Sequence, residues 1–172
     1  PAEECPFTWV RALQANADGF DRAYGERGAQ LGWTSMMVSE ADGGGSLSGR
    51  GVCDLALVAE EFGRLVSPGP LVPTNVVAHA LSIGGTDEQR ARWLPGLLSG
   101  EVIGAWLNGS ARVVEAGAPA DVLIQNLGQE LRLVAADQPA VRLPPWQGPD
   151  PARPHPPVPL RGPTHSDTIT RR

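Results

Sequence analysis

Residues 86–107 read TDEQRARWLPGLLSGEVIGAWL, and this stretch predicts how the fold changes along the chain. Thr86 and Gln89 form a capping box, in which each side chain bonds the backbone amide of the other residue. The box predicts a helix, and Pro95 should kink it because proline removes one helical hydrogen bond. The apolar run Val102–Leu107 then predicts a strand. The chain therefore passes from helices to strands near residue 100.

Earlier residues predict four more helices, separated by glycine-rich and proline-rich turns. These helices cover Trp9–Asn16, Phe20–Leu31, Gly51–Val66 and Leu71–Leu81. The last of them is apolar on nearly all sides, which indicates burial between other helices. The apolar positions predict a core of Leu13, Leu31, Trp33, Leu55, Phe62, Leu71, Val76, Leu81, Trp93 and Leu97.

Beyond residue 107 the sequence consists of short β-prone runs and then a tail rich in proline. The runs are Arg112–Val114, Asp121–Asn126 and Leu131–Ala135. Ten of the 17 prolines fall within residues 139–163, and proline cannot donate a hydrogen bond to a sheet. Thr164–Arg172 is polar, and we expect it to be disordered.

Composition excludes several classes of function. The net charge of −5 argues against a nucleic-acid partner, since phosphate binding needs a basic face. No apolar run reaches the roughly 20 residues that span a bilayer, and the first residues do not resemble a signal peptide. Cys5 and Cys53 form no metal-binding pattern. We expect two free thiols in the cytoplasm, with a single disulfide as the alternative.

Several motifs occur in a characteristic order. They are Leu31-Gly-Trp-Thr34, Val38-Ser-Glu-Ala-Asp-Gly-Gly44, Leu57-Val-Ala-Glu-Glu-Phe-Gly-Arg64, Thr86-Asp-Glu-Gln-Arg-Ala-Arg-Trp-Leu-Pro95 and Leu98-Ser-Gly-Glu101. In this order and spacing, residues 20–107 resemble the N-terminal helical domain of flavin-dependent acyl-CoA dehydrogenases. A looser similarity continues to about Val158.

This resemblance implies an α+β protein in three parts. We expect an all-α helical bundle domain over residues 1–100, an incomplete β-barrel-like middle domain over 101–148, and a Pro/Arg-rich tail over 149–172. It also implies the family's reaction, the removal of two hydrogens across the α,β bond of an acyl-CoA thioester. In the family a carboxylate takes the α-proton and FAD takes the hydride. Fatty acyl and steroid side chains are both possible substrates.

Three departures from the family pattern predict that the chain is inactive alone and binds no FAD by itself. A flavin-holding loop should follow the strand, but the sequence moves at Leu107-Asn108 to what resembles a later piece. Beyond it, Val113 and Glu115 replace residues that contact the flavin. A carboxylate about 4 Å from an anionic flavin would cost on the order of 4 kcal/mol at an effective dielectric of 20. The C-terminal bundle, with its catalytic Glu, is not matched. We therefore assign no catalytic, cofactor-binding or metal-binding residue.

The resemblance does suggest a wall of the acyl cavity at Val72, Thr74 and Asn75, with ordinary helix packing as the alternative. For three other candidate catalytic residues we favour a structural or surface role over a functional one. We expect His79 to be a hydrogen-bonded core histidine, and Glu60 and Glu61 to lie on a solvated face.

Three interpretations remain open. The chain is a fragment of an acyl-CoA dehydrogenase, a non-catalytic partner of a full-length paralogue, or a degraded gene product. The unusual composition of residues 149–172 favours the last of these mildly.

Overall fold

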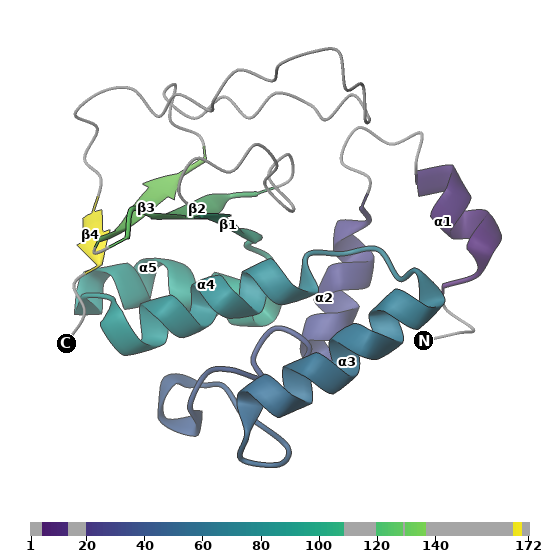
Figure 1. The fold of residues 1–172 in the computed structure, drawn as a ribbon, viewed down its shortest axis with the longest axis horizontal. Coiled ribbons are helices and arrows are strands. Elements are labelled where there is room, and N and C mark those ends of the chain that lie inside the picture. The colour runs from purple at the N-terminus through teal and green to yellow at the C-terminus, as the bar shows by residue number, and fades with distance from the viewer. Residues whose placement is uncertain (1–4, 14–19, 109–119, 129, 137–166, 170–172) are drawn as a thin grey trace.

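The computed structural model describes residues 5–13, 20–108, 120–128, 130–136 and 167–169. These residues form helices followed by one sheet, and Figure 1 shows the sheet lying on α4 and α5. The helices are α1 (Phe7–Leu13), α2 (Arg22–Gln30), the 3-10 helix η1 (Glu40–Asp42), α3 (Gly51–Leu65), α4 (Leu71–Gly84) and α5 (Asp87–Ser99). The strands are β1 (Gly104–Asn108), β2 (Val122–Asn126), β3 (Leu131–Ala135) and β4 (Asp167–Ile169).

The predicted capping box starts α5. The Thr86 hydroxyl accepts from the Gln89 amide at 3.2 Å, and the Gln89 side chain accepts from the Thr86 amide at 2.9 Å. Both bonds satisfy amides that the first helical turn leaves without partners. The helix continues through Pro95 and ends at Gly100, whose φ of 80° is left-handed. The predicted helix is confirmed.

The other helices lie near their predicted positions, with shifts set by their caps. Helix α2 begins after Asp21 rather than at Phe20, because the Asp21 side chain accepts from the Tyr24 amide and caps the first turn. Helix α1 begins two residues before Trp9, and residues 14–16 of that prediction lie outside the described part.

The sheet has the order β1-β2-β3-β4. Strands β1 and β2 are parallel, with Gly104 opposite Val122, and the other two pairs are antiparallel. Helix α4 packs closely on β1, since a Cβ on Gly104 would lie 2.8 Å from the Cβ of Val77. The main core joins apolar residues of α4, α5 and the sheet. Among the described residues the sheet is open, with β1 and β4 at its edges.

Several predictions about this part of the chain need correction. The predicted strand Val102–Leu107 is shifted, since β1 begins at Gly104 and includes Asn108, which pairs with Asn126. The family segment expected to be missing between Leu107 and Asn108 stays a prediction. Disorder was wrong for Asp167–Ile169, which adds β4 to the sheet because its backbone pairs with β3. Leu31 is 74% exposed instead of buried, since it caps the end of α2 and points outward. Val76 is only half-buried, and so are the predicted core residues Leu13, Trp33, Phe62 and Trp93.

Several expectations lie outside the described residues, namely the strand at Arg112–Val114, the positions of Val113 and Glu115, and the proline-rich segment 139–163. Cys5 is buried and Cys53 is exposed, and both are free thiols as predicted. In the described part of the chain, none of the helices combines the length and the apolar character that a bilayer crossing requires.

Candidate functional site

An apolar groove of about 480 Å³ runs between α1, α3 and the first turn of α4. Its walls carry no charged side chain and one hydroxyl group, that of Ser67. The lining residues are Val10, Ala59, Phe62, Gly63, Val66, Ser67, Pro68, Gly69, Leu71 and Val72. Ligand sites typically measure 300–1,000 Å³ and are mostly apolar. We call this surface the outer groove.

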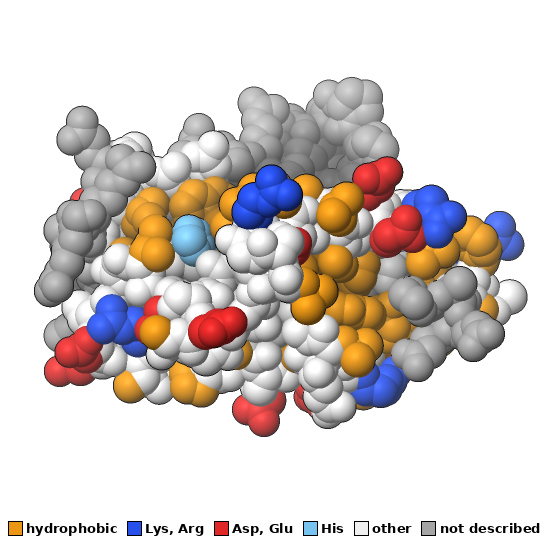
Figure 2. Space-filling view, turned by 90° about the horizontal axis from the view of Figure 1, so that it is seen from below, with side chains coloured by type: hydrophobic (Ala, Val, Ile, Leu, Met, Phe, Trp, Pro, Cys, Tyr) orange, Lys and Arg blue, Asp and Glu red, His pale blue; other side chains and the backbone are white. Residues whose placement is uncertain are grey.

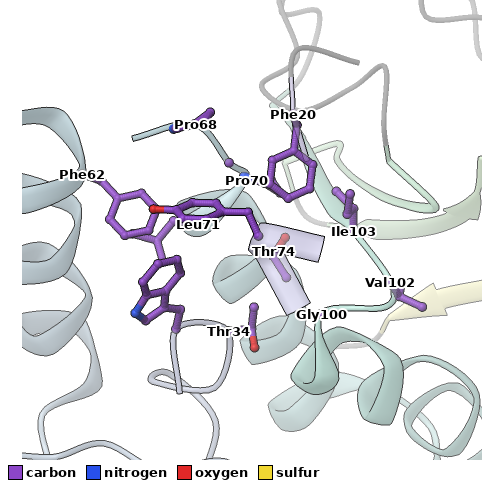
Figure 3. A pocket seen from close by; sticks show the side chains of 14 residues that line it. Phe20, Thr34, Phe62, Pro68, Pro70, Leu71, Thr74, Gly100, Val102 and Ile103 are labelled. Atoms are coloured by element: carbon purple, nitrogen blue, oxygen red, sulfur yellow. The ribbon is translucent and has the colours of Figure 1, made fainter. Parts of the chain in front are cut away.

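A second, much smaller space lies behind the outer groove, and we call it the inner cavity. Its volume is about 30 Å³, room for only one or two water molecules. Figure 3 shows Phe20, Phe62, Leu71 and Thr74 around it, from the segment before α2, from α3 and from α4. The space between these helices is therefore filled mainly by side chains.

Aromatic side chains build the wall of the inner cavity. Tyr24 and Trp33 meet edge-to-face with ring centroids 5.4 Å apart, and Trp33 and Phe62 do so at 4.9 Å. Such pairs contribute about 0.5–1.5 kcal/mol beyond their buried area. The cluster connects α2 to α3 through the segment that carries Trp33.

The outer groove and the inner cavity share one wall. Both are lined by Phe62, Pro68, Gly69 and Leu71. Figure 3 shows Pro68 and Pro70 passing above the inner cavity. We call residues 67–71 the partition.

The three predicted cavity residues lie in three different environments. Val72 is 38% exposed and lines the outer groove. Thr74 lines the inner cavity, and its hydroxyl accepts from the Gly104 amide at 3.4 Å. Asn75 is fully buried and lines neither space. A contact of any of them with an acyl group stays a prediction.

Asn75 instead ties two segments together. Its side-chain amide donates to the carbonyls of Trp33, at 2.7 Å, and Leu71, at 2.9 Å. Its Oδ1 atom is buried without a hydrogen-bond partner. These bonds hold the Trp33 segment against the start of α4, so Asn75 positions the wall rather than lining it.

The remaining candidates behave largely as predicted. The His79 ring nitrogen Nδ1 lies 2.8 Å from the Met37 carbonyl oxygen, which makes it a hydrogen-bonded histidine at the edge of the core. Glu61 is exposed and accepts from Arg64 at 2.7 Å, and this bond raises the pKa of Arg64. Glu60 is exposed as well. Neither carboxylate faces the groove or the cavity.

The described residues around these spaces do not fit a flavin dinucleotide. Its pyrophosphate requires cationic side chains or a set of converging N–H donors. Among the residues that the structure describes, no Arg, Lys or His lines the outer groove or the inner cavity. Within the described ranges, no group of three or more His, Cys, Asp or Glu side chains could hold a metal ion.

A broad apolar surface surrounds α3. Only Asp54 and Leu55 of its 15 residues are buried, and Leu47, Val52 and Leu57 are 101%, 68% and 65% exposed. Figure 2 shows apolar side chains gathered on the face that carries α3. Large exposed apolar patches on soluble proteins commonly mark interaction surfaces.

Sequence reasoning missed Phe20 and Tyr24, which line the inner cavity, and Ser67, which lines the outer groove. Phe20, Tyr24 and Ser67 have no motif, and Ser67-Pro-Gly-Pro70 reads simply as a helix stop. Only the contact between the Tyr24 and Ser67 hydroxyl oxygens, 2.7 Å apart, reveals their relationship.

Known proteins resemble this chain in sequence and in fold. Residues 3–101 match the family model described as "Acyl-CoA dehydrogenase, N-terminal domain". The (2S)-methylsuccinyl-CoA dehydrogenase of Cereibacter sphaeroides is 35% identical over 77 residues, which cover 44% of this chain and 14% of that protein.

Two solved structures are similar in fold. A steroid ACAD variant has a TM-score of 0.60 and 28% identity, over 77% of this chain and 44% of that one. An acyl-CoA dehydrogenase complexed with FAD from Bacillus anthracis has a TM-score of 0.61 and 21% identity, over 83% of this chain and 31% of that one. The chain thus spans less than half the length of each of these relatives.

Proposed function

The chain belongs to the acyl-CoA dehydrogenase family, and from this premise we propose that it supplies the helical wall of an acyl-CoA site. The reaction served would be the α,β-dehydrogenation of an acyl-CoA thioester with FAD. In this proposal the residues that line the outer groove bind the acyl chain. A further polypeptide, such as a full-length paralogous subunit, supplies the flavin and the catalytic base.

The outer groove is the observation that carries this proposal. Its size and its uncharged lining suit an aliphatic or polycyclic acyl group. Each buried methylene contributes about 0.8 kcal/mol, so extending an acyl group by four methylenes gains up to about 3 kcal/mol. This corresponds to an affinity on the order of 100-fold higher.

The division of labour follows from the chemistry of the lining. Proton abstraction needs a basic side chain within hydrogen-bond reach of the substrate. In the described part of the chain no carboxylate lines the outer groove or the inner cavity, and no cationic side chain lines them to meet a flavin pyrophosphate. The middle β-domain, which the resemblance describes as an incomplete barrel, would meet the second polypeptide along its open edges.

Acyl-CoA titrations test the groove directly. Purified chain is titrated with octanoyl-CoA, butanoyl-CoA and free CoA by calorimetry. We expect octanoyl-CoA to bind most tightly. Replacing Gly63 with Phe should fill the groove, because a Cβ at Gly63 meets no atom within 4 Å. Octanoyl-CoA affinity should then fall by about tenfold or more.

Gly63→Ala is the matched control and should keep the affinity of the original chain, since one methyl group leaves the groove open. Equal affinity of octanoyl-CoA and free CoA would refute the proposal. Flavin is tested separately by adding FAD to the chain alone and to its mixture with a full-length family member. A yellow complex of the chain alone would show that this polypeptide holds its own cofactor.

A second candidate function is that of a non-catalytic partner, which the exposed apolar side chains around α3 favour. In that case the chain would bind a full-length acyl-CoA dehydrogenase subunit through this face. Replacing Val52 and Leu57 together with Ser should abolish co-elution with the subunit on a sizing column. Unchanged octanoyl-CoA affinity in the same variant would separate this role from the first.

A further inference from the structure

We propose that the partition, residues 67–71, is a movable gate that sets how deeply an acyl chain enters, and that the Tyr24–Ser67 hydrogen bond is its latch. This inference rests on the proposed function, because it assumes that the outer groove receives the acyl chain. It adds a specificity-determining element that the family resemblance does not supply.

The partition separates two spaces that would form one if it moved. Pro68, Gly69 and Leu71 face the outer groove on one side and the inner cavity on the other. In the present arrangement only about 30 Å³ lies behind it, too little for an acyl chain. A ligand deeper than the outer groove therefore requires the partition to shift.

The backbone holds the partition only at its two ends. The Ser67 amide donates to the Phe62 carbonyl at 2.8 Å, and the Thr74 amide donates to the Pro70 carbonyl at 3.1 Å. Pro68 and Pro70 have no amide hydrogen to donate. Side chains must therefore hold the residues between these two backbone hydrogen bonds and reinforce the first of them.

Two side chains, that of Tyr24 in α2 and that of Phe20 just before it, contact the partition. The Tyr24 hydroxyl oxygen lies 2.7 Å from the Ser67 hydroxyl oxygen, and Tyr24 is only 1% exposed. The Phe20 ring packs on Gly69, where a Cβ would come within 3.1 Å of ring carbon Cε2. This hydrogen bond and this ring contact hold Ser67 and Gly69, while the Asn75 side chain and the core around Leu71 anchor the far end of the partition.

The backbone on either side of the latch has the properties of a hinge. Val66 is left-handed with φ 51°, a conformation that is strained for a β-branched residue. Gly69 has φ 141°, which side chains rarely adopt. The strain at Val66 persists only because the surrounding structure enforces it, whereas Gly69 adopts its backbone conformation without a steric cost.

Removing the latch should shift the gate toward its open state and favour longer ligands. Apparent affinity for a ligand that needs the open state scales with the population of that state. Loss of one hydrogen bond corresponds to a shift of roughly fivefold. The ratio of dodecanoyl-CoA to octanoyl-CoA affinity should therefore rise roughly fivefold in Ser67→Ala and in Tyr24→Phe.

The experiment measures this ratio by calorimetry in the original chain, in both latch variants and in Ser99→Ala. Ser99→Ala also removes a hydroxyl hydrogen bond, to the Gly96 carbonyl, but Ser99 is exposed and lines neither the outer groove nor the inner cavity. We expect the Ser99 control to keep the original ratio. If the original chain binds octanoyl-CoA and both latch variants keep its ratio, the gate is refuted while the proposed function stands.

A measurement without acyl-CoA distinguishes failure of the gate from failure of the proposed function. Tyr24 is the sole tyrosine of the chain, so fluorotyrosine labelling gives a fluorine NMR signal from the latch alone. Ser67→Ala should broaden this signal or add a second one, because the gate then exchanges between two positions. If no acyl-CoA binds, the proposed function fails, and an unchanged fluorine signal in Ser67→Ala would overturn the gate as well.

Discussion

Arg22 and Asp121, 99 positions apart in the sequence, join the helices to the sheet through a two-pronged ion pair. Both terminal nitrogens of Arg22 lie 3.2 Å from the Asp121 carboxylate oxygens. The same carboxylate accepts from the buried Ile103 amide at 2.8 Å. Asp121 therefore connects α2, the approach to β1 and the start of β2.

The two partners of this pair should differ in their effect on stability. Arg22→Ala should cost about 0–1 kcal/mol, because its side chain is 44% exposed and surface ion pairs contribute little. Asp121→Ala should cost about 1–3 kcal/mol, because it also leaves the Ile103 amide buried without a partner. Urea unfolding of both variants measures this difference, and equal losses would contradict the central role of Asp121.

Val66 should limit the stability of α3. A β-branched residue in the left-handed region costs roughly 1–3 kcal/mol, and glycine is the usual residue at this helix position. Val66→Gly should raise the free energy of unfolding by about 1 kcal/mol, since Val66 is 56% exposed and loses little burial. In urea unfolding, Val66→Ala should gain less because it keeps a Cβ. If Val66→Gly is less stable than the original chain, Val66 does not strain the end of α3.

Two glycine-to-alanine changes should have opposite effects. At Gly28 a Cβ would lie 1.9 Å from Trp33 ring carbon Cε3, so Gly28→Ala must displace the indole and should cost about 1–3 kcal/mol. At Gly63 a Cβ meets nothing, so Gly63→Ala should stabilise α3 by up to about 1 kcal/mol. Thermal unfolding with near-ultraviolet circular dichroism detects both changes. Equal changes in stability of the two variants would contradict the close packing of Trp33 on Gly28.

Asp54 should make stability depend on acid pH. Hydrogen bonds from the Ser46 and Ser48 hydroxyls and the Ser48 amide lower the pKa of Asp54 from 3.8 to about 2. A lowered folded-state pKa stabilises the protein above the unfolded pKa of about 3.9, and this stabilisation is lost as pH falls through about 2.

Asp54→Asn should therefore be less stable than the original chain at pH 7 and nearly equal to it near pH 2. Urea unfolding across this range measures the difference. Glu61→Gln, which alters an exposed carboxylate on the same helix, is the control. A constant difference between Asp54→Asn and the original chain at all pH values would exclude the linkage.

Local signals in the sequence predicted most of the elements. The capping box at Thr86 and Gln89, and the β-prone run Leu131–Ala135, depend on neighbouring residues alone. The family resemblance also came from local motifs, and the match over residues 3–101 confirms it. The expectation that the chain binds no FAD by itself stays a prediction.

Long-range contacts produced the failures of prediction. Asp167–Ile169 is polar and short, but it forms β4 because β3 offers an unpaired edge. Leu31 is apolar but exposed, since the direction of its side chain depends on where α2 ends. Val72, Thr74 and Asn75 are close in sequence, but the helix turns them toward a groove, a cavity and a buried carbonyl pair.

The sequence by itself determined the family, the order from α1 to β3 of the main helices and strands, and the capping of α5, because these depend on short-range patterns. Tertiary structure alone decided the outer groove, the inner cavity and the partition between them. Tyr24 and Ser67 are separated by 43 positions, and no local pattern links them. Their contact exists because the packing of α2 beside the end of α3 brings two hydroxyl groups together.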